Sequence, residues 1–344
     1  MSSRITRHIG FIIVLFAFLG CSSKYKTIGT EFKNGDITFS ANIYKPEGKG
    51  LFPAVIMVHG SKNHTKDFYT EYSEYFADNG IVTLNYDNRG HGKSEGNLWT
   101  STFEDLASDL NAAVAYLQTL DYVNSEKIGF WADSHGGWIV LIADMLYDNI
   151  DFIINKSGPA VTPLATVEFD VNRNYLSKQD VPEKEKYRIL NLYPKIFEYL
   201  TRNRNENLWT DIKDELDSFE PTPYFKNDFD EYYKSLLKPP SEMSPVDKVQ
   251  IAPSGRDYDF DPRPFLEKIN TRMLLIYGTA DKLIPVNECI TVIENINNPY
   301  IEMIVYEKAD HGMRIHKKPD ILFGTRFPDG YFEKLVKFID KSDK

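Results

Sequence analysis

Short apolar runs alternate with helix-like segments along most of this sequence. The runs lie at 53–60, 81–86, 127–131, 151–156, 272–278 and 300–306, and each has the length of a strand buried on both faces. Segments with helical spacing lie between them, at about 67–79, 103–120, 134–147, 285–297 and 331–341. Strands that alternate with helices in this way form parallel sheets with helices on both faces. We therefore predict an α/β fold with a doubly wound, mostly parallel sheet.

Two regions depart from this alternation. Residues 27–44 read as two strands joined at Asn34-Gly35, a dipeptide typical of tight hairpin turns. Residues 161–255 are charged, aromatic-rich and helical in character, with prolines between the segments. We predict a core formed by residues 27–160 and 256–344, with residues 161–255 inserted as a helical cap over the ends of the strands.

The first 26 residues are predicted to lie outside the fold. Arg4 and Arg7 precede an apolar stretch from Ile9 to Leu19, which is short for a membrane span and typical of a signal peptide over residues 1–20. Cys21 follows directly after Gly20 and resembles the lipobox cysteine of bacterial lipoproteins, although Phe18 and Leu19 are bulkier than usual there. The resemblance implies that Cys21 is lipidated and that residues 21–26 tether the protein to a bacterial envelope membrane. The alternative is an ordinary cleaved signal peptide and a secreted protein.

Charge and composition exclude several classes of function. The formal net charge is −10, which argues against broad nucleic-acid binding and favours a small or uncharged substrate. The seven histidines show no metal-binding spacing, and the sequence GHGKS at 90–94 lacks the first glycine of a phosphate-binding loop. We therefore expect neither a metal nor a cofactor.

The sequence GFWADSHGGW at 129–138 places Ser134 between a predicted strand and a predicted helix. A nucleophile on such a sharp turn needs small residues two positions away on either side, and Ala132 and Gly136 meet this need. A helix-capping serine would explain Ser134 but not its small neighbours. Asp133 as a carboxylate nucleophile is disfavoured, because it lies one residue before the apex of the turn.

A nucleophilic serine needs a base, and the base needs an orienting acid. Asp281 follows the strand at 272–278, and His311 follows the strand at 300–306, so both are expected at the carboxyl edge of the sheet with Ser134. A turn-forming aspartate and a surface histidine are the alternatives. Backbone N–H groups of Ser61 and His135 are the candidate donors of an oxyanion hole.

Five motifs in order resemble the α/β-hydrolase superfamily: VHGS at 58–61, YDNRGHGKSEG at 86–96, FWADSHGGW at 130–138, YGTADKLIP at 277–285 and ADHG at 309–312. They span the chain from about residue 27 to its end, apart from the cap, and the order Ser, Asp, His is that of the superfamily. The nearest resemblance is to esterases of the prolyl oligopeptidase and dienelactone hydrolase branch. It implies an α/β-hydrolase fold and a serine carboxylesterase acting on a small-molecule ester.

Two other functions remain open at this point. One is an aminopeptidase or other peptidase of the prolyl oligopeptidase type, although too few residues precede the first core strand for that family's propeller. The other is an inactive hydrolase fold that binds a ligand or an envelope partner.

Four other residues are assigned structural roles. We expect Arg89 in an ion pair, Asp310 in its own loop, Cys289 buried on a helix, and His59 supporting the oxyanion loop.

Overall fold

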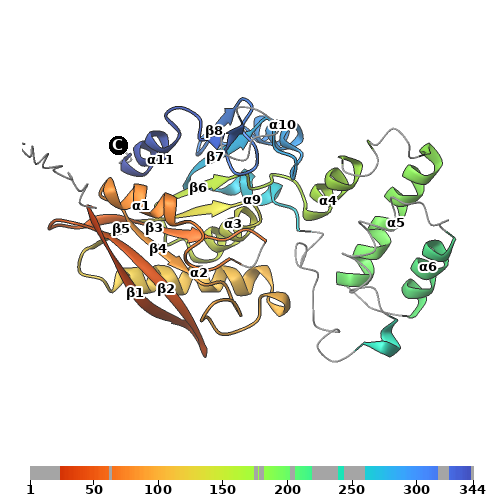
Figure 1. Ribbon diagram of the computed structural model, residues 1–344, viewed down its shortest axis with the longest axis horizontal. Coiled ribbons are helices and arrows are strands. Elements are labelled where there is room, and N and C mark those ends of the chain that lie inside the picture. The colour runs from red at the N-terminus through yellow and green to blue at the C-terminus, as the bar shows by residue number, and fades with distance from the viewer. Residues whose placement is uncertain are drawn as a thin grey trace, which may run out of the picture.

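The computed structural model describes residues 24–61, 64–173, 177, 182–201, 206–218, 239–243, 260–316 and 325–341. Its centre is an eight-stranded sheet with the order β1-β2-β4-β3-β5-β6-β7-β8 (Figure 1). The strands are β1 (Tyr25–Asn34), β2 (Ile37–Pro46), β3 (Phe52–Val58), β4 (Val82–Tyr86), β5 (Val123–Asp133), β6 (Phe152–Lys156), β7 (Arg272–Gly278) and β8 (Ile301–Tyr306). The pairs β1–β2 and β2–β4 are antiparallel and all other pairs are parallel. The prediction of a doubly wound, mostly parallel sheet is confirmed.

Helices cover both faces of the sheet. The helices along the core are α1 (Thr70–Asp78), α2 (Phe103–Gln118), α3 (Gly136–Tyr147), α9 (Arg263–Lys268), α10 (Val286–Ile296) and α11 (Tyr331–Asp340). Side chains of β3 show how the strand serves both layers: Ala54, Ile56 and Val58 join one hydrophobic cluster, and Val55 and Met57 join the other. Such alternation is required of a strand with side chains on both faces. It explains why β3 reads as an unbroken apolar run.

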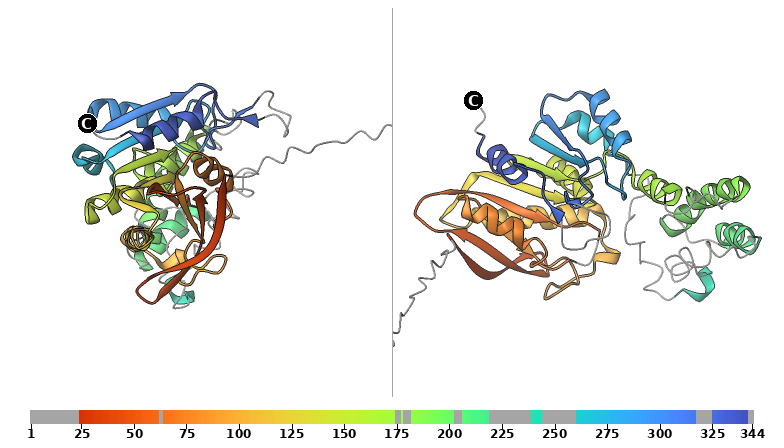
Figure 2. Two further views of the ribbon diagram at one scale, coloured as in Figure 1. Left: turned by 90° about the vertical axis from the view of Figure 1, so that its left-hand side faces the viewer. Right: turned by 45° about the horizontal axis from the view of Figure 1, so that its top comes forward.

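The described residues between 161 and 255 form helices α4 (Pro163–Val171), α5 (Glu183–Thr201) and α6 (Glu206–Asp217), with short 3-10 turns at Pro240–Glu242 and, in the core, at Leu98–Thr100. Figure 1 and the turned views of Figure 2 show α4 to α6 grouped at one end of the sheet. Two short strands, β9 (Ile315–His316) and β10 (Thr325–Arg326), pair antiparallel with each other outside the main sheet. No helix among the described residues is both long and apolar enough to span a lipid bilayer.

The starts of α3 and β5 differ from the sequence-based expectation for identifiable reasons. Helix α3 begins at Gly136 rather than at Ser134, because Ser134 has φ 53°, a left-handed conformation that cannot belong to a right-handed helix. Strand β5 begins at Val123 rather than at Lys127, because Val123 pairs with Phe52 across an irregularity in the register.

A buried ion pair ties the loop after β4 to α2. Arg89 Nε lies 2.5 Å from Asp109 Oδ2, and their side chains are 9% and 3% exposed. Asn34 Nδ2, at the end of β1, donates a hydrogen bond of 2.8 Å to Asp109 Oδ1. The carboxylate therefore holds three separate elements together, as expected for Arg89 from the sequence.

We predict that Asp109→Ala lowers the free energy of unfolding by about 3 kcal/mol, because it leaves the Arg89 cation buried without its partner. Urea denaturation measures this loss. The control is Lys341→Ala, which removes an exposed ion pair with Glu302 and should cost less than about 1 kcal/mol. Equal losses in the two variants would contradict the prediction.

Candidate active site

Ser134 lies at the topological switch point of the sheet. The chain runs from β3 to β4 on one side and then returns to β5 on the other, so the loops after β3 and β5 diverge at their carboxyl ends. The positive φ of Ser134 is a strained conformation for a residue with a side chain, and it turns the serine out of the line of β5. The N–H of Ser134 donates a 2.9 Å hydrogen bond to Lys156 O of β6, which secures the turn.

Close packing explains the glycine that follows. A Cβ on Gly136 would lie 2.7 Å from His59 O and 3.1 Å from Val58 O. Any larger residue would push the loop after β3 away from the turn at Ser134. Gly60 also lies against the turn at Ser134, because a Cβ on Gly60 would lie 3.5 Å from Ser134 Cβ.

The structure brings His311 and Asp281 into direct contact. His311 Nδ1 donates a hydrogen bond of 2.7 Å to Asp281 Oδ2, and the Asp281 side chain is fully buried. The other carboxylate oxygen accepts hydrogen bonds from the N–H groups of Leu283 (2.8 Å) and Ile284 (3.3 Å). The loops that carry the pair are joined by a hydrogen bond of 2.9 Å from Ala280 N to Ala309 O. Asp281 is therefore held rigidly while the imidazole faces the site.

Ser134 and His311 line one cavity of about 340 Å³. Among the described residues, no direct hydrogen bond joins the side chains of Ser134 and His311. The other lining residues come from the loop after β3, the start of α1 and the segment before it, the strand ends and the segments after β7 and β8. They are Gly60, Ser61, His64, Phe68, Tyr69, Glu71, Tyr72, Trp131, Asp133, Lys156, Leu283, Gly312, Arg314 and Phe327. Five of the 16 lining residues are Phe, Tyr or Trp, and four are charged Asp, Glu, Lys or Arg residues.

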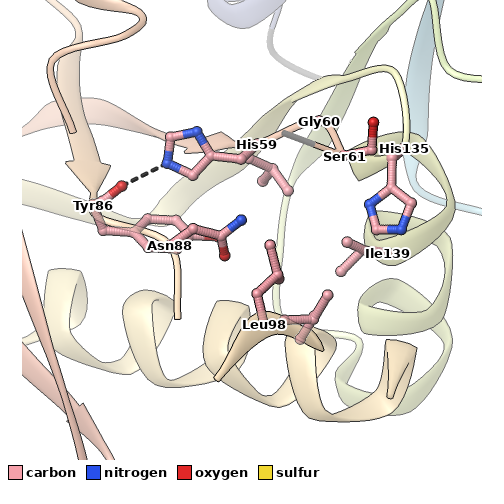
Figure 3. Close-up of a pocket in the computed structure, with 10 residues that line it drawn as sticks. His59, Gly60, Ser61, Tyr86, Asn88, Leu98, His135 and Ile139 are labelled. Atoms are coloured by element: carbon pink, nitrogen blue, oxygen red, sulfur yellow. Dashed lines mark hydrogen bonds between the residues drawn. The ribbon is translucent and has the colours of Figure 1, made fainter. Parts of the chain in front are cut away.

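The two proposed oxyanion donors come from neighbouring loops. Ser61 follows β3, and His135 is the residue directly before α3. Within the described part of the chain, the N–H of Ser61 has no acceptor. Both residues also line a second, much smaller space of about 10 Å³ (Figure 3). His59, Gly60 and Ser61 lie along one side of this space, beside His135.

A buried ion pair lies beside Ser134, and sequence reasoning did not find it. Lys156 Nζ is 2.5 Å from Asp133 Oδ1, with the two side chains 5% and 12% exposed. Tyr69 Oη donates a 2.8 Å hydrogen bond to Asp133 Oδ2. Burial raises the pKa of Asp133, but the charges of Lys156 and His311 and the hydrogen bonds from Lys156 and Tyr69 outweigh it, so the net pKa is below the usual value. Asp133 is thus an ion-pair partner in this structure.

His59 supports the loop before Ser61. Its Nε2–H donates a 2.5 Å hydrogen bond to Tyr86 O (Figure 3). Its ring stacks on Tyr69 with the ring centroids 5.3 Å apart. Burial lowers the pKa of His59 to about 4, so the ring is neutral near pH 7. The neutral ring donates from Nε2 to the backbone of Tyr86 and so fixes the end of β3 against the end of β4.

Other residues singled out in the sequence also have structural partners. Asp310 Oδ1 accepts hydrogen bonds from the N–H groups of Gly312 and Arg314, and its Oδ2 contacts His316 at 2.6 Å. Cys289 is buried in α10, and burial raises its pKa to about 12. Cys21 and the predicted signal peptide lie outside the described residues. No cluster of three potential metal ligands occurs in the described ranges.

The fold is shared with proteins of known structure. A Pyrococcus furiosus esterase superposes with a TM-score of 0.54 at 19% identity, covering 92% of this chain and 91% of the other. The sheet order, the turn at Ser134 and this likeness define the class of fold, which is that of the α/β-hydrolases. More specifically, residues 52–219 match a family model described as "Serine aminopeptidase, S33". The matched segment contains Ser61, Ser134 and His135 and ends before Asp281.

Two curated relatives match over shorter segments. The "Quorum-quenching protein AidA" of Acinetobacter baumannii is 27% identical over 150 residues, which are 41% of this chain and 49% of the relative. A "Putative carboxymethylenebutenolidase" of Synechocystis is 30% identical over 139 residues, which are 35% of this chain and 54% of the relative. The chain thus spans about half the length of each of these two relatives.

We predict that His59 makes stability depend on pH between about 4 and 6.5. Its folded pKa is about 4, below the ordinary histidine pKa of 6.5, so the unfolded state binds the extra proton first as pH falls. Stability from this group is complete above about pH 6.5 and decreases by on the order of 3 kcal/mol as pH falls to 4.

Urea unfolding of wild type and His59→Gln at pH 7 and pH 4.5 measures this effect. The pH-dependent loss should be smaller in His59→Gln than in wild type. The control is His91→Gln, at a partly exposed loop position, which should keep the wild-type loss. A His59→Gln variant with an unchanged pH-dependent loss would contradict the assignment.

Proposed function

We propose that this protein is a serine hydrolase that cleaves carboxylic esters of small neutral molecules, with Ser134, His311 and Asp281 as its catalytic triad. One observation carries the proposal: the buried Asp281 carboxylate holds the His311 ring in the wall of the same cavity that Ser134 lines on its strained turn. That is the constellation expected when serine, base and orienting acid act together.

In the proposed reaction, Ser134 Oγ attacks the ester carbonyl while His311 Nε2 accepts its proton. The hydrogen bond from Nδ1–H to Asp281 leaves Nε2 as the basic nitrogen and orients it. Rotation of the serine side chain can shorten the approach to His311, because catalytic hydrogen bonds are often long without substrate. Imidazolium His311 then protonates the leaving alcohol.

The tetrahedral intermediate carries a negative charge on its former carbonyl oxygen. We assign the N–H groups of Ser61 and His135 as its donors, each worth about 3 kcal/mol in the transition state. Collapse of the intermediate gives an acyl-enzyme on Ser134. Water, deprotonated by His311, attacks the acyl carbon, and the same donors stabilise the second intermediate before the acid is released.

The charge pattern of the cavity favours an ester over an amino-acyl substrate. Among the described lining residues, Glu71 pairs with Arg314, and Asp133 pairs with Lys156. An aminopeptidase must bind the free ammonium group of its substrate, and a buried cation without a partner is costly. The paired carboxylates offer no free partner there, whereas a neutral ester needs none.

Two alternatives follow from specific observations. The description of the matching family model favours an aminopeptidase as the second candidate. The absence of a Ser134–His311 hydrogen bond among the described residues would suit a fold used only for binding.

We predict that an alkyl fluorophosphonate labels the wild-type protein and that Ser134→Ala abolishes this labelling. Asp281→Asn should reduce ester turnover by about 10³-fold or more, because the imidazole loses its orientation. Ser125→Ala, at an exposed position of β5, is the control and should label like wild type. An unlabelled wild type would support the binding alternative.

The same preparations distinguish ester from amide cleavage. The value of kcat/KM for nitrophenyl acetate should exceed that for amino-acyl nitroanilides by about 100-fold or more. The reverse preference, again lost in Ser134→Ala, would support the aminopeptidase.

We also propose that the chain is anchored to a bacterial envelope membrane by lipid on Cys21. The support is sequence alone: two arginines, an apolar stretch and a small residue before the cysteine. Acyl chains on one cysteine would hold an otherwise water-facing enzyme at a membrane surface.

We predict that the full chain, expressed in a bacterial host with an alkyne-tagged fatty acid, incorporates the label and fractionates with membranes. Cys21→Ser should lose both properties. Cys289→Ser is the matched control, because Cys289 is buried and should not be acylated. Label that persists in Cys21→Ser would contradict the proposal.

A further inference from the structure

We propose that the buried Asp133–Lys156 ion pair positions the catalytic machinery by fixing the backbone of His311 and, through Tyr69, the oxyanion loop. The proposal rests on the function proposed above and adds positioning residues to it. Its basis is a continuous set of contacts that joins the loops after β3, β5, β6 and β8.

Lys156 connects the serine turn to the histidine loop. Its Nζ contacts Asp133 Oδ1 at 2.5 Å and donates a 3.0 Å hydrogen bond to His311 O. Ser157 Oγ donates a second hydrogen bond of 2.9 Å to the same carbonyl. Two donors from the end of β6 therefore clamp the backbone of His311, while Asp281 holds its ring.

Asp133 extends the connection in the other direction. Its Oδ2 accepts the hydrogen bond from Tyr69 Oη, and that hydroxyl accepts a long hydrogen bond of 3.4 Å from Gly60 N. Gly60 directly precedes Ser61, the candidate oxyanion donor. Asp133 itself directly precedes Ser134. Its carboxylate is therefore linked to the nucleophile through the chain, to the oxyanion loop through Tyr69, and to the His311 loop through Lys156.

A purely stabilising role is a poor explanation for this pair. Burying two charges costs several kcal/mol per ion, and apolar replacements of buried ion pairs are often neutral or stabilising. An apolar pair could not hold these groups in position, because it would leave His311 O with one donor and Tyr69 Oη without its acceptor. A shift of about 1 Å in a reacting group can cost about 100-fold in rate.

The test compares Lys156→Met with Arg272→Met, using nitrophenyl acetate as substrate. Both variants remove a largely buried cation of the sheet. Arg272, however, is the first residue of β7 and lies at the amino ends of the strands, away from the active site, where it pairs with Asp151 at 2.8 Å. We expect Lys156→Met to lower kcat by about 10- to 100-fold with KM within about 3-fold of wild type. Arg272→Met should leave kcat within about 2-fold of wild type while lowering the melting temperature.

Milder variants keep the proposal testable if Lys156→Met does not fold. Ser157→Ala removes one donor from His311 O, and Tyr69→Phe removes only the hydroxyl that joins Asp133 to Gly60. Each should lower kcat by about 3- to 10-fold with little change in KM. A kcat within 2-fold of wild type in Lys156→Met, or in both milder variants, overturns the proposal.

Hydrogen exchange gives a readout that does not depend on esterase activity. Amides of residues 309–314 should exchange at least about 10-fold faster in Lys156→Met, or in Ser157→Ala, than in Arg272→Met, because the His311 loop has lost a clamp. Equal exchange overturns the positioning role. A wild type with no turnover and no fluorophosphonate labelling refutes the proposed function, while the exchange comparison still decides the positioning role.

Discussion

The site depends on the parallel pairing of β3 with β5. Val58 pairs with Ala132 at the ends of these strands, so the loops that follow leave the sheet at the same level. Only this register brings the loop with Ser61 against the turn at Ser134, and the close approach of Gly136 to His59 O fixes the contact. A slip of one residue would turn every side chain of a strand to the other face, so the two core clusters also enforce the register.

The rest of the site is built on the other half of the sheet. Gly278 of β7 pairs with Tyr306 of β8, which brings the loops of Asp281 and His311 together. Strand β6 lies between the two halves, with Lys156 paired to Asp133 on one side and to Ile276 on the other. From the end of β6, Lys156 contacts both loop systems, through Asp133 on one side and His311 O on the other. This location explains why a lysine there is buried among hydrogen-bond acceptors.

The sequence predicted those features that depend on local pattern. Buried strands appear as apolar runs, and Asp281 and His311 stand out because each follows such a run. Lys156 was missed because a lysine at the end of a strand reads as its solvent-exposed boundary, and its partner Asp133 lies on another strand. Tyr69 was missed because an aromatic residue at the start of a predicted helix indicates only packing; in the structure it directly precedes α1. Contacts between distant segments become visible only once the register of the strands is known.

The cavity wall also indicates where substrate selection would occur. The described lining residues come from the core and include the rings of Phe68, Tyr69, Tyr72 and Phe327, with the ring centroids of Tyr72 and Phe327 5.7 Å apart. The Arg314 guanidinium lies 3.6 Å from the Phe327 ring centroid and also pairs with Glu71, so its charge is already engaged by the wall. None of the described residues of α4, α5 and α6 lines this cavity. For a hydrolase of this geometry, a substrate group in the cavity would meet the rings of Phe68, Tyr69 and Tyr72, at and just before the start of α1, and the ring of Phe327 in the segment after β8.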